Sequence, residues 1–192
     1  MISSSTFHVI STELVVGSFA MSGLCFLLHA LCRYELIKSQ NLISVTDNVA
    51  HFALMFGIVA TPFAIFSGIS ASPGSGLSTP ILVNKMFLSM TGLGLGLAAL
   101  ISRWKMGSSI LIERKPMLLQ TFTGMSASGL MLLTASAGGT FARGESLLDI
   151  LSLPYDIVIL MPVTISVILL ISGLATTASA LWKILGKSTV YH

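Results

Sequence analysis

Histidine is the first residue type to consider for chemistry in this chain, because imidazole ligates metals and exchanges protons near neutral pH. His29 lies near the end of the first long apolar run, and His51 lies near the start of the second. Successive helices joined by a short loop run antiparallel, so the two rings are expected at the same end of a helix pair. Two facing imidazoles would ligate the iron of haem b or help to bind a quinone. The alternative is that both histidines only make hydrogen bonds at the membrane interface.

A second candidate group combines one imidazole with two thioethers. Met86 and Met90 are four residues apart, so they share one face of a helix. His8 is expected at the same end of the molecule, and the three side chains together would suit Cu(I). The alternative is packing or lipid contact, since the chain spreads 10 methionines along its length.

Glu13 is the one carboxylate well inside an apolar run. Ionisable side chains at such positions are expensive in lipid and are usually paired or functional. Lys85 opens the third apolar run at the same expected level, so the sequence predicts an ion pair between Glu13 and Lys85. A proton or cation relay through Glu13 is the functional alternative.

The composition places all of these residues in a membrane. Of the 192 residues, 54% are hydrophobic and 9% are charged, and the mean hydropathy is +0.92. A soluble domain carries about 25% charged residues. We therefore expect a multi-pass protein of the cell or inner membrane, surrounded by lipids. The net charge of +3 belongs to the loops and does not indicate nucleic acid. No loop is long enough for a catalytic domain, so the chain is not expected to catalyse a reaction alone.

Five apolar runs predict an all-α fold with five transmembrane helices in a single domain over residues 1–192. The predicted spans are residues 9–32, 48–69, 81–102, 117–141 and 156–182. Thr46 or Asp47 is expected to cap the second helix. In residues 145–153, Glu145 and Asp149 stand among leucines and an isoleucine, which predicts a short amphipathic interfacial helix on the outer side.

The basic residues predict the orientation of these spans. Two of them, Lys85 and Arg143, fall on one side of the membrane. The other eight fall on the opposite side: Arg33, Lys38, Arg103, Lys105, Arg114, Lys115, Lys183 and Lys187. Since Lys and Arg concentrate in cytoplasmic loops, the N-terminus is predicted outside and the C-terminus in the cytoplasm.

Small residues at four-residue spacing predict close helix contacts within the membrane. Such pairs occur in the third, fourth and fifth predicted spans: Gly92 and Gly96, Gly124 and Ser128, Gly173 and Thr177. A five-helix bundle needs fewer such faces for itself. The surplus predicts other transmembrane subunits as partners.

Three features between residues 7 and 150 resemble a family of four-helix membrane proteins that are sometimes attached to Rieske-type iron–sulfur domains. They are His8 at the start of the first span, Ser67-Gly68 at the end of the second, and the sequence GGTFARG from Gly138 to Gly144. The surplus of small-residue faces, together with the lack of a catalytic domain or a strong ligand motif, predicts an accessory, structural subunit of a larger membrane complex. The resemblance implies that this complex is a membrane oxidoreductase, such as a respiratory complex or a membrane monooxygenase. Two alternatives stay open from the residues: a redox subunit that binds haem b or quinone, and a small transporter or proton channel.

Overall fold

Four long helices make up most of the chain that the structure describes. The computed structural model describes residues 3–71, 79–146, 148–152 and 171. The helices are α1 (Ser4–Arg33), α2 (Gln40–Ala71), α3 (Pro80–Met106) and α4 (Arg114–Arg143). A short 3-10 helix, η1 (Gly107–Leu111), joins α3 to α4, and a second, η2 (Asp149–Leu151), follows α4.

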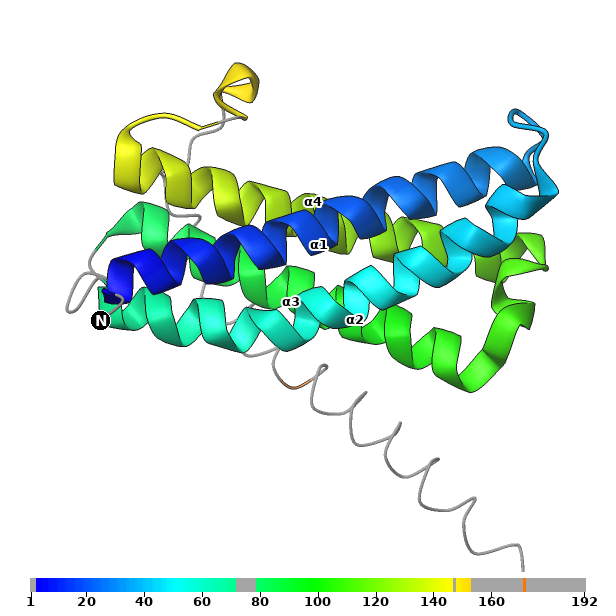
Figure 1. The fold of residues 1–192 in the computed structure, drawn as a ribbon, viewed down its shortest axis with the longest axis horizontal. Helices are drawn as coiled ribbons and strands as arrows, with labels where there is room; N and C mark the ends of the chain where they lie inside the picture. Colours follow the sequence, from blue (N-terminus) through cyan, green and yellow to red (C-terminus); the bar gives the residue numbers. More distant parts are fainter. Residues whose placement is uncertain (1–2, 72–78, 147, 153–170, 172–192) are drawn as a thin grey trace, which may run out of the picture. The chain divides into compact units, whose positions relative to one another are not determined.

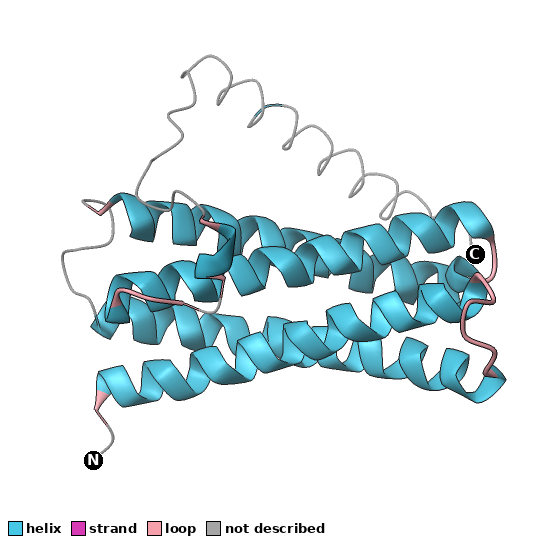
Figure 2. Ribbon diagram, turned by 90° about the horizontal axis from the view of Figure 1, so that it is seen from above, coloured by secondary structure: helices cyan, strands magenta, loops and turns pink. Residues whose placement is uncertain are grey.

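The four helices run alternately up and down in one bundle (Figures 1 and 2). α1 packs against α2 and α4, and α3 packs against α4. α2 and α3 are also neighbours, but they touch far less than the other three pairs. The bundle therefore has one weakly packed side, between α2 and α3.

Local sequence sets the ends of the helices. Ser3 precedes α1, and its Oγ accepts a hydrogen bond of 3.2 Å from the amide of Thr6. Pro80 begins α3, where its missing N–H removes no helical hydrogen bond. Gly107 and Gly144 follow α3 and α4 with φ angles of 63° and 79°. Glycine adopts these positive angles at low energetic cost, so both helices end there.

The second helix begins well before its predicted start. Ser39 Oγ accepts a hydrogen bond of 3.4 Å from the amide of Leu42, and α2 begins at Gln40. The predicted capping role of Thr46 or Asp47 is wrong, because both residues lie inside α2. Thr46 Oγ1 donates a hydrogen bond of 2.7 Å to the carbonyl oxygen of Leu42, one turn back in the same helix. A search for apolar runs misses this polar first part of the helix.

The prediction of five membrane spans is met only in part. α1, α2 and α3 are each long and apolar enough to cross a membrane, and no other helix in the described ranges meets both conditions. α4 has 30 residues but buries polar side chains in the bundle, among them Gln120, Thr121, Ser128 and Ser136. The predicted span 156–182, apart from Ile171, lies outside the described residues. In the region of the surface helix predicted over residues 145–153, the described residues form one 3-10 turn, η2.

Small residues let the helices approach closely within the bundle. The phenyl ring of Phe26 lies directly against Gly124, where a Cβ atom would overlap it. A Cβ on Gly23 would lie 2.7 Å from Cβ of Ser128, so α1 and α4 meet there too. At these two glycines, α1 and α4 lie so close together that no larger residue would fit.

The predicted pair Gly92 and Gly96 also faces the interior. A Cβ on Gly92 would lie 3.1 Å from Met131 of α4, and one on Gly96 would lie 3.2 Å from Ile58 of α2. Both glycines are buried. The third predicted pair, Gly173 and Thr177, lies outside the described residues.

The contact between Gly124 and Phe26 gives a test of this packing. Gly124→Ala adds a methyl group where a fully buried ring stands, so it should destabilise the bundle by about 1–3 kcal/mol. Gly129→Ala is the matched control on the same helix, because nothing lies within 4 Å of a Cβ there. The control should be neutral or stabilising by up to about 1 kcal/mol. Unfolding free energies in detergent micelles measure both, and equal values for the two variants would contradict this account of the packing.

Candidate functional site

An ion pair joins α2 to α3 at the end of the bundle where α1 ends. Arg103 of α3 donates two hydrogen bonds to the carboxylate of Asp47, from Nη2 to Oδ2 at 2.7 Å and from Nε to Oδ1 at 3.2 Å. The side chain of Asp47 is 14% exposed and that of Arg103 is 23% exposed. A two-pronged Arg–carboxylate contact of this kind fixes geometry as well as charge.

His51 extends this network into the bundle. Its Nδ1 lies 2.9 Å from Oδ1 of Asp47 and 2.8 Å from the Asp47 carbonyl oxygen. Its Nε2 lies 3.0 Å from Nε2 of Gln120, and that amide nitrogen also donates to the carbonyl oxygen of Ala99 at 2.8 Å. These partners are all satisfied when His51 carries its proton on Nδ1 and accepts at Nε2. The network thus connects α2, α3 and α4.

His29 lies nearby but makes a separate set of contacts. Its side chain is buried, with Nδ1 3.2 Å from the carbonyl oxygen of Ile43 and 3.3 Å from Oγ1 of Thr46. Its Nε2 is buried without a hydrogen-bond partner among the described residues. The ring of Phe26 meets His51 edge-on, with 5.1 Å between ring centroids.

This geometry bears on the predicted cofactor. Ligation by two histidines needs one ring nitrogen from each, and both nitrogens of His51 are already engaged. Neither cavity described below is lined by His29 or His51. Haem or quinone binding by this pair would require Gln120 to leave His51. What the arrangement does as it stands is hold three helices together through a carboxylate, an imidazole and an amide.

A cavity of about 470 Å³ lies at the opposite end, between the four helices. Its wall is largely apolar. The polar side chains that line it include His8 and Thr12 of α1, Lys85 and Ser89 of α3, and Thr134 of α4. His8 Nδ1 lies 3.1 Å from Oγ of Ser67, and the imidazole packs on Gly68, where a Cβ would lie 2.9 Å from Cε1.

The structure brings together two of the three residues of the predicted copper site. His8 and Met86 line the same cavity, whereas Met90 does not line it and is 62% exposed. Within the described ranges, no three His, Cys, Asp or Glu side chains gather as a metal site would require.

The predicted ion pair between Glu13 and Lys85 is not formed. Glu13 is exposed on α1, and the ion pairs among the described residues both involve Asp47. Lys85 instead reaches across the cavity to α4, where its Nζ lies 3.0 Å from the position of a Cβ on Gly138.

Arg103 and Gln120 are not predicted as site residues from the sequence, and Asp47 is predicted there only as a possible helix cap. A usable signal was present, because Asp47 and His51 are four residues apart and therefore share a helix face. The partner residues on α3 and α4 gave no such signal, since their distance from α2 depends on how the helices pack.

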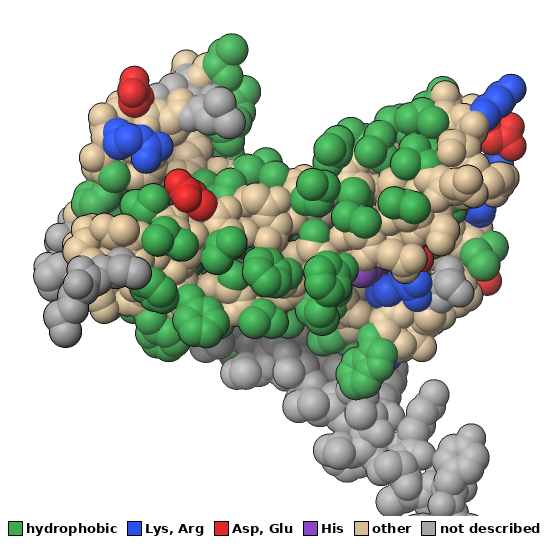
Figure 3. Space-filling model, in the orientation of Figure 1, with side chains coloured by type: hydrophobic (Ala, Val, Ile, Leu, Met, Phe, Trp, Pro, Cys, Tyr) green, Lys and Arg blue, Asp and Glu red, His purple; other side chains and the backbone are tan. Residues whose placement is uncertain are grey.

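Charged side chains gather mainly toward the two ends of the bundle, and hydrophobic side chains cover much of the face between them (Figure 3). With three helices apolar enough to cross a bilayer, these features define a multi-pass integral membrane protein. No protein-family model, characterised protein or solved structure matches the chain.

The Asp47–Arg103 pair can be tested by a double-mutant cycle. Asp47→Ala or Arg103→Ala leaves the other charge partly buried and unpaired, so each variant should lose about 2–4 kcal/mol of unfolding free energy. The double variant should lose less than the sum, with a coupling of about 1 kcal/mol or more. Glu113→Ala, at an exposed acid before α4, is the control and should change little. Additive losses in detergent micelles would contradict a direct interaction.

Proposed function

We propose that this protein is an accessory, structural subunit of a larger membrane complex. The observation that supports this role is a row of large apolar side chains on the outer face of α2, which we call the Phe seam. It consists of Phe52, Phe56, Val59, Phe63 and Phe66, each between 47% and 70% exposed. The spacing alternates between four and three residues, which is the spacing at which two helices interlock.

The Phe seam supports a partner better than the small-residue faces do. Gly92, Gly96, Gly124 and Ser128 are all buried inside the bundle, so none of them is left for an outside helix. Four of the chain's 10 phenylalanines, in contrast, lie in the Phe seam. Aromatic side chains are enriched where one protein surface docks on another.

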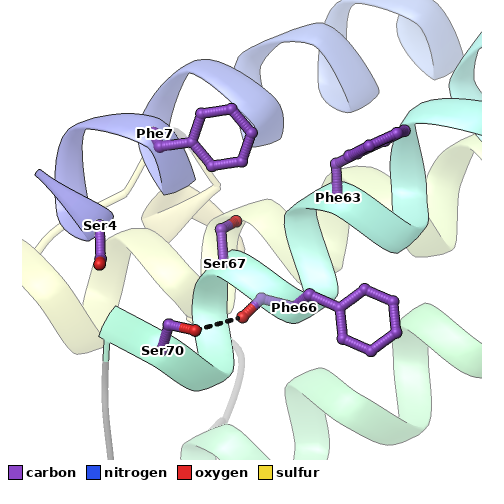
Figure 4. Close-up of a pocket in the computed structure, with 6 residues that line it drawn as sticks. All are labelled: Ser4, Phe7, Phe63, Phe66, Ser67 and Ser70. Carbon is purple, nitrogen blue, oxygen red and sulfur yellow. Dashed lines mark hydrogen bonds between the residues drawn. The ribbon is translucent and has the colours of Figure 1, made fainter. Parts of the chain in front are cut away.

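A small pocket lies at one end of the Phe seam. Figure 4 shows Phe7 of α1 together with Phe63 and Phe66 of α2 around it. Ser4, Ser67 and Ser70 complete its lining, and its volume is about 250 Å³. A bulky apolar side chain of a partner helix lying along α2 would fit there as a knob in a hole.

The predicted topology belongs to this proposal. α4 packs against both α1 and α3, which supports a fourth crossing despite its polar interior face. Residues 156–182 are apolar enough for a fifth. Arg33, Arg103 and Lys105 lie at the end of the bundle opposite Ser3, which supports an outer N-terminus and a cytoplasmic C-terminus.

Cysteine labelling in intact cells tests this orientation. With a membrane-impermeant maleimide, Thr6→Cys should be labelled from outside, while Lys38→Cys should react only after the membrane is permeabilised. The two positions lie in or next to opposite ends of α1 and both are exposed. The reverse pattern of labelling would contradict the proposed orientation.

We also propose that the complex is a membrane oxidoreductase, on the strength of the resemblance in residues 7–150. In this role the chain would contribute packing surface, and its partners would hold the redox centres. A redox band that belongs to the isolated protein and disappears in His51→Ala would contradict the accessory role and favour the cofactor-binding alternative.

Substitution of the Phe seam tests the proposed complex. Phe56→Ala combined with Phe63→Ala should reduce the amount of co-purifying membrane subunits about tenfold or more in polymer nanodiscs, since such aromatic anchors dominate interface energies. The control is Phe87→Ala combined with Phe122→Ala, two phenylalanines on α3 and α4 that are more exposed than Phe56 and Phe63. Quantitative mass spectrometry of the captured subunits measures the effect, and a reduced-minus-oxidised spectrum of the wild-type sample tests for redox centres. If both double variants change the amount of captured subunits equally, the side chains of the Phe seam are ordinary lipid-facing side chains and not a docking surface.

A further inference from the structure

The cavity at the outer end of the bundle has the size and lining of a ligand site. Its volume of about 470 Å³ falls in the range of small-molecule sites, which are mostly apolar with few polar groups. Val15, Ile65, Leu82 and Met131, from four different helices, are part of the apolar wall. The lining comes entirely from α1 to α4.

Most of the hydroxyl groups in the lining are already satisfied. Thr12, Thr61 and Thr134 each donate to a carbonyl oxygen one turn back in their own helix, at 2.8 Å. Ser89 donates to the carbonyl oxygen of Met86 at 2.9 Å. The protons of these hydroxyl groups are therefore already used in hydrogen bonds, and the groups add little polarity to the cavity.

Lys85 is different, because its ammonium group has no anionic partner in the described part of the chain. Nζ lies against Gly138, and His8, which lines the same cavity, is no counter-ion for a lysine. Glu13 does not line the cavity. A lysine charge beside an apolar wall in the membrane is unfavourable unless an anion accompanies it.

We propose that the cavity binds an anionic amphiphile, with its carboxylate or phosphate head group on Lys85 and its acyl chain between α2 and α3. The acyl chain matches the apolar wall, and the head group supplies the missing negative charge. Such a molecule enters sideways from the lipid, through the side of the bundle where α2 and α3 touch least. The site does not depend on the Phe seam, whose side chains do not line it.

Binding of spin-labelled palmitate to the purified protein in a neutral detergent tests the proposal. Lys85→Met removes the charge and keeps an unbranched side chain, so it should weaken binding about tenfold or more. Lys105→Met, at an exposed lysine of the opposite end, should bind as the wild type does. Hexadecanol, which has the chain without the charge, should compete equally weakly in all three proteins. Ser89→Phe, which fills the cavity, should weaken both ligands.

Two further arms identify the source of the head group and the role of the chain. Spin-labelled phosphatidylglycerol in place of palmitate shows whether a phosphate head group has the same dependence on Lys85. Inorganic phosphate should not displace either probe, because it lacks the acyl chain; displacement by phosphate alone would overturn the amphiphile assignment. Binding of both lipids that is unchanged in Lys85→Met would overturn the proposal. The proposal would also be overturned if palmitate bound only after Asp156→Asn. Asp156, which lies outside the described residues, would then be the counter-ion of Lys85.

Discussion

The ion pair between Asp47 and Arg103 closes the side of the bundle that packing leaves weak. α2 and α3 touch less than the other neighbouring helices do, so apolar contact contributes little to holding them together. Two hydrogen bonds between the guanidinium and the carboxylate supply a link there, in surroundings of lower dielectric constant than water. His51 and Gln120 then carry the connection to α4. At the other end the four helices surround a cavity.

Many polar side chains of the bundle are used within their own helices. Ser11, Thr61 and Thr123 all donate to a carbonyl oxygen four residues back. Such hydrogen bonds satisfy the hydroxyl in lipid without linking one helix to another. Ser22 is an exception, since its Oγ donates to the carbonyl oxygen of Ala50 across the contact between α1 and α2. A high content of serine and threonine therefore does not by itself make a polar path through this molecule.

The sequence predicts where the helices lie along the chain well, but it predicts poorly which of their side chains meet. Apolar runs locate α1, α2 and α3, because lipid forces a crossing segment into a helix whatever its glycine content, and a fourth run locates α4. The same criterion misses the polar start of α2, where Thr46 and Asp47 are helical although they resemble caps. The expected depth of Glu13 and Lys85 in the membrane predicts an ion pair between them, which the structure does not form. The rotation of each helix about its axis decides which face a side chain takes, and small differences in packing set that rotation. The Asp47 network depends on this rotation in three helices at once.

Phe26 occupies a position that belongs to both parts of the molecule. One side of its ring fills the space left by Gly124, and the ring also meets the imidazole of His51 edge-on. A displacement of this ring would therefore change both the apolar contact between α1 and α4 and the polar network around His51. The two regions therefore share one side chain: a change in the spacing of α1 and α4 would move the ring against which the His51 imidazole packs.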